Sequence, residues 1–286
     1  MPKTQTALPG LKSVVLCLAP LSLLAFVYYP TFLWMVDRWM ARDSYYGHGF
    51  LIPFISIYWI FKARAELATL EKRTDVGGLF LLLFGVFLQW AASVLRIYFL
   101  SAVSLVFILL GGILFLFGRK VFRKLWFPVF FLFLMIPLPL LLISDITLKM
   151  KFFVSEITAA CLRSMGLPTI REGSYLHMRH SSILVGDPCS GLRSFLAFLC
   201  LGLVFAYGSN LALWKRGVVA LAGLPIALLS NVGRVVFLAL LSEIYGMEVV
   251  HGWIHDFSGL AAFVIAMVLF LMIRKKLETF PVWVPQ

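Results

Sequence analysis

A cysteine, an arginine and a histidine in the last third of the chain together offer the chemistry of acyl transfer. Cys189 lies just before the apolar run Phe195–Tyr207, Arg234 lies within another apolar run, and His255 immediately precedes a third. A thiolate can attack a carbonyl carbon, a guanidinium can stabilise the oxyanion that develops, and an imidazole can move the proton. The three residue types therefore predict a cysteine nucleophile with its own acid–base partner.

The residues that precede Cys189 predict the start of a helix. Asp187 can act as an N-cap and Pro188 suits the first helical position, which places Cys189 in the first turn. Free backbone N–H groups and the helix dipole favour an anion there. With Arg193 one turn further on, we expect this thiol to ionise more readily than a free thiol, although the Asp187 carboxylate opposes that effect.

Composition identifies the class of protein that must position these residues. Of the 286 residues, 62% are hydrophobic and 13% are charged. Several apolar runs approach 20 residues, which is typical of a polytopic membrane protein. The net charge of +12 comes from Lys and Arg in short gaps between these runs, so we attribute it to membrane orientation and contact with lipid, not to nucleic acid. The four cysteines form no Cys-x-x-Cys pair, and we expect neither a metal nor a cofactor.

We expect an all-α bundle of about eight transmembrane helices, forming one integral membrane domain over residues 1–286. The second span is the weakest because it is short and contains Pro53, and the fifth should kink or end at Pro137 and Pro139. A very tight turn at Arg96 must join the third span to the fourth. The expected spans are roughly Leu11–Val36, Tyr45–Phe61, Gly77–Leu95, Ile97–Gly118, Leu125–Ile143, Leu192–Tyr207, Gly217–Leu241 and Phe257–Ile273.

The basic residues test this number of spans, since they form four clusters between the apolar runs. With eight spans and a cytoplasmic N-terminus, all four clusters and both termini lie on the cytoplasmic side of the membrane. Seven or nine spans would break this agreement. The clusters are Lys62, Arg64, Lys72 and Arg73; Arg119, Lys120, Arg123 and Lys124; Lys215 and Arg216; and Arg274, Lys275 and Lys276.

The largest gap between spans, about residues 144–190, then forms an insertion on the outer, periplasmic face. Its first half predicts an amphipathic helix in the membrane interface that ends near Gly166 and Pro168. Its second half, about Ile170–Val185, predicts a small hairpin that leads into Cys189. The expected apolar face of the helix consists of Ile146, Met150, Phe153, Ile157 and Ala160.

This topology brings the three reactive groups to one leaflet. Asn231 and Arg234 are three residues apart and share a helix face. Arg234 lies roughly 10 Å inside the outer end of its span. A cation at such a depth costs about 2.5–3.5 kcal/mol, so it should face a polar cavity or a partner. His255 starts the last span at the outer surface.

We therefore expect Cys189 to attack a peptide carbonyl while Arg234, with Arg193, stabilises the oxyanion. His255 acts as general base and acid, and Asp256 orients its ring. Backbone N–H groups after Cys189 can supply part of the oxyanion site, and water or an acceptor amine can resolve the thioester. The other supporting residues are Asn231 and Ser190.

The motifs that carry these residues resemble those of the exosortase/archaeosortase family over nearly the whole chain. They are Cys189-Ser190-Gly191-Leu192-Arg193-Ser194, Asn231-Val232-Gly233-Arg234, His255-Asp256-Phe257-Ser258-Gly259 and, near the N-terminus, Tyr46-Gly47-His48-Gly49-Phe50-Leu51-Ile52-Pro53. The resemblance implies a membrane cysteine protease or transpeptidase of the hydrolase class. It assigns Cys189 as nucleophile, Arg234 as the essential arginine and His255 as the histidine, which favours a bacterial-type exosortase.

The resemblance also implies the partners. Substrates would be exported proteins with a C-terminal sorting signal of the PEP-CTERM kind: a short motif, one transmembrane helix and a basic tail. Membrane lipids surround the enzyme, and the acceptor is not identified. Asp187 and Pro188 stand where small residues are common in the family, which leaves the subfamily and the recognised motif open.

Structural roles are the alternative for each of these residues. Cys189 could be an inert thiol or form a disulfide with Cys161, and Arg234 could be a packing residue that pairs with Asn231. Arg193 could anchor the helix at the interface. Cys17 and Cys200 could be packing residues, and His177 and His180 could be surface residues. His251 and His255 could bind a metal ion together. His48 could line the substrate path or form a hydrogen bond at the interface.

Two other classes of function fit parts of the chain. A transporter could bind an anion at Arg234 and Asn231, but its polar residues should recur in both halves, whereas here they concentrate in the last third. A non-enzymatic assembly protein for cell-surface polymers would need no reactive thiol.

Overall fold

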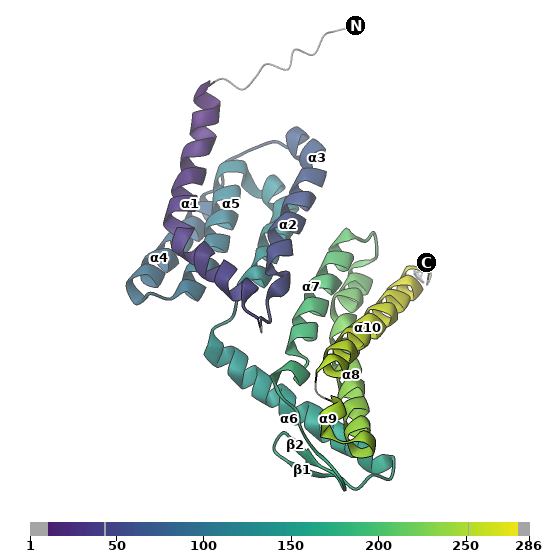
Figure 1. Ribbon diagram of the computed structural model, residues 1–286. Helices are drawn as coiled ribbons and strands as arrows, with labels where there is room; N and C mark the ends of the chain where they lie inside the picture. The colour runs from purple at the N-terminus through teal and green to yellow at the C-terminus, as the bar shows by residue number, and fades with distance from the viewer. Residues whose placement is uncertain (1–10, 43, 251, 280–286) are drawn as a thin grey trace. The chain divides into compact units, whose positions relative to one another are not determined.

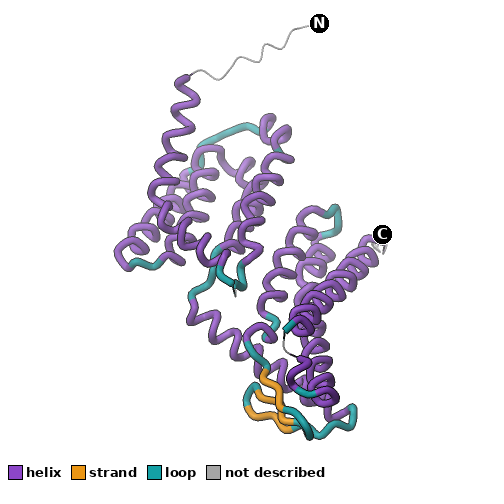
Figure 2. Tube along the Cα trace, viewed as in Figure 1, coloured by secondary structure: helices purple, strands orange, loops and turns teal. Residues whose placement is uncertain are grey.

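The computed structural model describes residues 11–42, 44–250 and 252–279, with the backbone alone described for residues 11–21 and 249. Almost all of this part is helical (Figures 1 and 2). Contacts divide the chain into two compact units, Met1–Pro137 and Leu138–Gln286, here called the N-terminal and C-terminal units. The single domain expected over residues 1–286 stays a prediction.

The N-terminal unit is built around a hairpin of two long helices. Its elements in order are α1 (Leu11–Met40), η1 (Gly47–Phe50), α2 (Leu51–Lys62), α3 (Arg64–Thr69), α4 (Val76–Leu95), α5 (Tyr98–Phe130) and η2 (Phe131–Met135). The backbones of α4 and α5 approach closely because glycines face the partner helix: a Cβ on Gly78 would lie 2.2 Å from the Phe115 nitrogen. The expected tight turn is present at Arg96, whose φ of 55° ends α4.

Two of the basic clusters meet at one end of the N-terminal unit. Lys124 pairs with Glu66 at 2.6 Å, and Lys120 pairs with Glu71 at 3.1 Å. The hydrogen bonds from Lys120 and Arg73 hold the pKa of the Glu71 carboxyl below its usual range. The loop before α4 and the segment after Gly118 therefore share a side, as the topology requires.

The C-terminal unit packs four long helices with a small sheet. Its elements are α6 (Leu140–Ser164), β1 (Ile170–Glu172), β2 (Tyr175–His177), β3 (Ser182–Leu184), η3 (Asp187–Cys189), α7 (Leu192–Gly208), α8 (Leu213–Tyr245), α9 (Met247–Val250) and α10 (Trp253–Thr279). The strands form one antiparallel sheet in the order β1-β2-β3, so the expected hairpin is present with a third strand added (Figure 2).

The sheet is fastened to the end of α8. Glu243 accepts hydrogen bonds from the His180 backbone at 3.0 Å and from the Ser181 hydroxyl at 3.1 Å. Leu176 and Val185 are buried in one apolar cluster with Cys189 and Val235. The segment that leads into Cys189 is therefore part of the packed core of this unit.

Helix α8 is the central helix of the unit, since α6, α7 and α10 all contact it. At its first turn the buried Lys215 donates to the carbonyl of Leu277, near the end of α10. Arg234 lies 19 residues further on, about 28 Å along the helix. The basic ends of α8 and α10 therefore lie opposite the reactive residues, as the charge pattern predicts.

The structure supports only part of the expected membrane topology. Five helices of the described part are long and apolar enough to cross a membrane, which makes this a polytopic helical membrane protein but does not support eight spans. One of them, Tyr98–Met135, covers nearly all of the fourth expected span and the first part of the fifth, although Gly118 at φ 78° breaks its helix. The second expected span is a helix of only 12 residues, Leu51–Lys62, about 18 Å long.

The amphipathic helix also differs from its prediction. The helical segment at the start of the fifth expected span ends at Met135, and the next helix, α6, begins at Leu140. Pro137 and Pro139 interrupt the helix between these two residues. The residues that α6 buries are not those of the expected apolar face, and Phe153 is 52% exposed. Packing selects a face of smaller side chains: Ile143, Thr147, Val154, Ser155, Thr158, Ala159 and Leu162.

Candidate active site

Three separate elements of the C-terminal unit bring the thiol, the imidazole and the guanidinium together. Cys189 ends η3, Arg234 lies in α8, and His255 lies in the first turn of α10. The Cys189 Sγ atom lies 3.6 Å from His255 Nε2, and Arg234 Nη2 lies 3.1 Å from the same nitrogen. The structure thus brings these three side chains together, and their catalytic roles stay a prediction.

The local structure around Cys189 differs from the prediction. Asp187–Cys189 form a 3-10 turn, Gly191 follows at φ 81°, and α7 begins only at Leu192. Cys189 therefore precedes the helix and does not lie in its first turn. The argument for an ionised thiol from the helix N-terminus does not apply, so proton removal depends on the groups that face the sulfur.

The Asp187 carboxylate has a different partner from the one expected. It makes no side-chain cap and instead pairs with Lys151 of α6, Nζ to Oδ1 at 2.5 Å. The Lys151 side chain is only 20% exposed. This ion pair ties the turn that carries Cys189 to α6, and it draws the negative charge of Asp187 towards a cation.

Asn231 and Gly191 fix the turn from the other side. Asn231 Nδ2 donates to the Cys189 carbonyl at 2.7 Å, and both residues are buried. A Cβ on Gly191 would lie 3.0 Å from the same Nδ2 atom, so the glycine makes room for this bond as well as providing the positive φ. Asn231 thereby fixes the position of the Cys189 backbone.

Two backbone donors of the Cys189 turn are already in use. The Cys189 N–H donates to the Gly186 carbonyl at 3.0 Å, and the Ser190 N–H donates to the Asp187 carbonyl at 3.2 Å. The buried Ser190 hydroxyl also donates to Asp187 O, at 2.8 Å. These groups stabilise the turn, and the side chain of Arg234 is a donor that lies beside the imidazole.

Arg234 is held by four contacts from two segments, η3 and α10. Its Nη2 donates to the His255 carbonyl at 3.1 Å, its Nε to the Ser258 hydroxyl at 3.2 Å, and its Nη1 to the Pro188 carbonyl at 3.3 Å. Gly259 lets the guanidinium approach α10, since a Cβ there would lie 3.4 Å from Cζ. A planar, five-donor group suits such a divided set of acceptors.

The contacts of His255 define its tautomer. Guanidinium N–H groups only donate, so Nε2 must accept from Arg234 and the ring proton must lie on Nδ1. Nδ1 faces Asp256 Oδ1 at 3.3 Å, although the Asp256 side chain is 88% exposed. The imidazole therefore presents an unprotonated nitrogen to the thiol, and Asp256 supports that orientation from the solvent side.

Several predicted residues are not part of this cluster. Arg193 is exposed, and His48 lies in η1 of the N-terminal unit. Cys161 and Cys189 are both free thiols, which excludes the disulfide between them in this structure. His177 bonds to Ser182 within the sheet. His251 and the side chain of Cys17 lie outside the described residues.

Sequence reasoning missed Lys151, Ser258 and the Pro188 carbonyl. Ser258 follows His255 by three residues in the same motif, which is a signal that could have placed it on the same helix face. The backbone carbonyl and Lys151 had no such signal, because one is independent of residue type and the other lies 36 residues before Asp187.

Comparison with known proteins identifies the family of this chain. The searches of curated proteins and of solved structures find no match. A family model described as "Transmembrane exosortase (Exosortase_EpsH)" matches residues 34–272, which include every residue of the cluster. Because this match covers most of the chain, the protein belongs to the transmembrane exosortase family.

Proposed function

We propose that this protein is a cysteine endopeptidase or transpeptidase that cleaves C-terminal sorting signals of exported proteins. The observation that carries the proposal is the 3.6 Å approach of Cys189 Sγ to His255 Nε2, with Arg234 on the same nitrogen. A thiol, a base and a cation at one point are the groups that peptide cleavage needs. Family membership supports the same chemistry.

In the first step the Cys189 proton passes to His255 Nε2, and the sulfur forms a bond to the scissile carbonyl carbon. In the structure Nε2 accepts a hydrogen bond from Arg234. This hydrogen bond must break when the substrate binds, so that Nε2 can accept the thiol proton. The substrate oxygen offers Arg234 a better acceptor as it becomes negative. Collapse of the intermediate breaks the C–N bond, and His255 returns the proton to the leaving amine.

The product of this step is a thioester on Cys189. Water or an acceptor amine then attacks the thioester carbonyl, gives its proton to His255 and releases the thiol. Asp256 would hold the Nδ1 proton in place throughout, and Asn231 would keep the Cys189 carbonyl fixed.

We place the protein in a bacterial inner membrane with both termini in the cytoplasm and the reactive cluster on the periplasmic side. The distance of about 28 Å along α8 between Lys215 and Arg234 supports opposite sides. An eight-span topology is part of this proposal. It requires α1 to span and the short α2 to cross together with adjacent chain, since neither is among the long apolar helices of the described part. It also requires the segment Tyr98–Met135, which is interrupted at Gly118, to contribute to two spans.

Substitution of the nucleophile tests the function. In cells that co-express a tagged protein with a C-terminal motif, helix and basic tail, Cys189→Ala should abolish processing without a change in membrane expression. Cys161→Ala is the matched control, since Cys161 is also a free thiol of the same unit. Normal processing by Cys189→Ala would reject the proposal.

The transporter alternative has less support. Asn231 Nδ2 is bonded to the Cys189 carbonyl, and the Arg234 guanidinium contacts Pro188, His255 and Ser258. A shared anion site of Arg234 and Asn231 would have to break these bonds first.

A further inference from the structure

A polar network joins α1, α4 and α5 inside the N-terminal unit. Thr31 and Ser101 hydroxyls lie 2.7 Å apart, and Gln89 Oε1 accepts from Ser101 at 2.7 Å and from Ser104 at 3.0 Å. Because the Ser101 proton goes to Gln89, Thr31 must donate to Ser101. The hydroxyl protons of this network are therefore committed within it.

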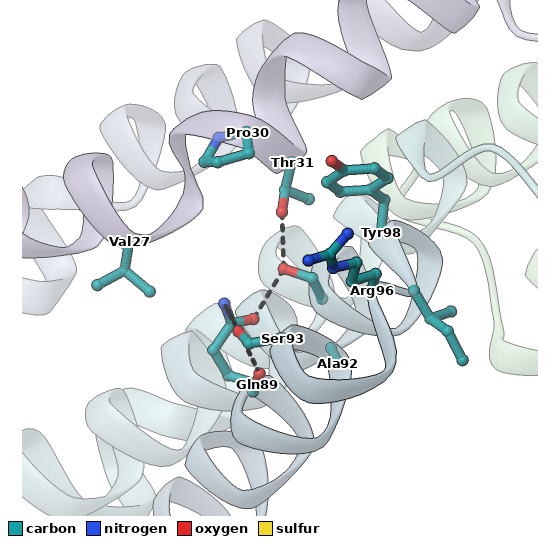
Figure 3. Close-up of a pocket in the computed structure, with 10 residues that line it drawn as sticks. Val27, Pro30, Thr31, Gln89, Ala92, Ser93, Arg96 and Tyr98 are labelled. Carbon is teal, nitrogen blue, oxygen red and sulfur yellow. Dashed lines mark hydrogen bonds between the residues drawn. The ribbon is translucent and has the colours of Figure 1, made fainter.

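A pocket of about 330 Å³ opens beside this network (Figure 3). It lies between the middle of α1 and the turn that joins α4 to α5, and no acidic residue lines it. The lining residues are Val27, Pro30, Thr31, Gln89, Ala92, Ser93, Arg96, Ile97, Tyr98 and Ser101.

Arg96 occupies an unusual backbone conformation at the mouth of this pocket. Its φ of 55° is the one positive value for a residue other than glycine in the described part of the chain. A left-handed conformation of this kind costs roughly 1–2 kcal/mol and is often found where a side chain contacts a ligand. Figure 3 shows the guanidinium on the same side of the turn as Thr31 and Tyr98.

The donors at the pocket exceed the acceptors that the protein provides. Among the described residues, neither the Arg96 guanidinium nor the Tyr98 hydroxyl makes a side-chain hydrogen bond or ion pair. The Gln89 amide has only a 3.5 Å contact with Ser93. A positive charge, five guanidinium donors and two further donor groups together call for an anion with several oxygens.

The surface next to the pocket is apolar and exposed. Val27 and Ile97 line the pocket and are 40% and 42% exposed, while Trp90 and Val94 of α4 are 62% and 64% exposed. In a polytopic membrane protein such a surface faces lipid chains. A ligand that contacts both the pocket and this apolar surface must carry an anionic head and an apolar tail.

We propose that this pocket binds the phosphate of a phospholipid headgroup, with Arg96 as its cation and Tyr98 and Gln89 as further donors. The acyl chains lie along Val27, Ile97 and the exposed face of α4. This site is separate from the peptide-cleavage chemistry proposed above and does not depend on it.

Lipid retention in native mass spectrometry of the detergent-purified protein tests this proposal. We expect dioleoylphosphatidylglycerol to remain bound, and dioleoylglycerol and oleate, which lack a phosphate, to be lost. Arg96→Asn should weaken phosphatidylglycerol binding by about tenfold, since a charge-assisted hydrogen bond is removed. Asparagine tolerates the left-handed conformation, so the turn can persist.

Two further variants keep the test decisive. Tyr98→Phe retains the ring that stacks on Trp34 at 6.0 Å and removes only the hydroxyl, so it should reduce retention by a smaller factor. Arg42→Asn removes another exposed arginine, which does not line the pocket, and should bind as the wild type does. Wild-type retention by both Arg96→Asn and Tyr98→Phe would overturn the proposal.

The source of the phosphate is settled in the same experiment. Displacement of the lipid by millimolar inorganic phosphate would confirm the phosphate site and assign its ligand to the solution. Equal retention of dioleoylglycerol or oleate would overturn the proposal, because the phosphate would then contribute nothing.

Discussion

At the scale of single residues, the arginine carries the largest share of the site's organisation. Arg234 contacts the backbone before Cys189, the His255 ring and carbonyl, and Ser258. It therefore links all three segments that supply reactive groups. Arg234 Nη2 donates to His255 Nε2, which is the atom that must accept the thiol proton. Arg234 can therefore order the site before substrate binds and stabilise the oxyanion afterwards.

Arg234→Lys tests this dual role. Lysine keeps the charge but lacks the planar fork that reaches several acceptors, so we expect processing to fall by about 10²–10³-fold. The matched control is Arg216→Lys, in the same helix but about 27 Å away along its axis, and its rate should stay near that of the wild type. Near-normal rates for Arg234→Lys would show that charge alone suffices.

The residue types of the site could be predicted from the sequence, but their local geometry could not. The sequence shows directly that a cysteine, an arginine and a histidine lie in or beside apolar runs. The positive φ of Gly191 and the pairing of Asp187 with Lys151 depend on where other elements lie. A capping rule that is sound for an isolated segment was wrong here because the fold offers Asp187 a better partner.

At the scale of elements, the turn that carries Cys189 is held by α6 on one side and α8 on the other. Lys151 binds the Asp187 carboxylate, and Asn231 binds the Cys189 carbonyl. Helices α6 and α8 also share the apolar cluster that contains the Cys189 side chain. The position of the sulfur therefore depends on helix packing more than on the helix that follows it.

Gly191→Ala should disturb this turn. A Cβ there would approach Asn231 Nδ2 to 3.0 Å, and a left-handed alanine costs about 1–2 kcal/mol, so the midpoint of thermal unfolding in detergent should fall. Gly233→Ala is the matched control: its Cβ meets nothing within 4 Å, and alanine favours a helix by up to about 1 kcal/mol. A Gly191→Ala variant as stable as Gly233→Ala would contradict the described turn.

Helix periodicity predicted the long helices well and the face of α6 poorly. The boundaries of α4 and α7 lie close to those expected, because long apolar runs end at charged or turn-forming residues. In α6 both large and small apolar side chains recur at helical spacing. The smaller side chains of α6 are the buried ones, and Phe153 is exposed. Hydrophobicity alone therefore did not identify the buried face.

At the scale of the whole molecule, the charge pattern and the helix ends within each unit support the proposed orientation. Lys215 and Leu277 meet at one end of the C-terminal unit, while Cys189 and His255 meet near the opposite end of α8. In the N-terminal unit, the ion pair between Lys124 and Glu66 gathers two basic clusters on one side. This agreement survives even though the helices that are long and apolar enough to span are fewer than expected.

Cysteine accessibility tests that orientation. In a background with Cys17, Cys161, Cys189 and Cys200 replaced by alanine, a cysteine at the exposed Arg179 should react with an impermeant maleimide added to spheroplasts. A cysteine at Asn210, between α7 and α8, should react only after permeabilisation. Labelling of both from the same side would mean that α7 does not cross the membrane.

The central claim is that Cys189 forms a thioester with the cleaved substrate, and intact-protein mass spectrometry measures that intermediate directly. After incubation with a substrate that carries a sorting signal, the account predicts a mass increase equal to that of the N-terminal cleavage fragment minus one water. The added mass should map to the peptide that contains Cys189, disappear with hydroxylamine and be absent in Cys189→Ala. Cleavage of the substrate by Cys189→Ala, or an adduct on another residue, would contradict the account.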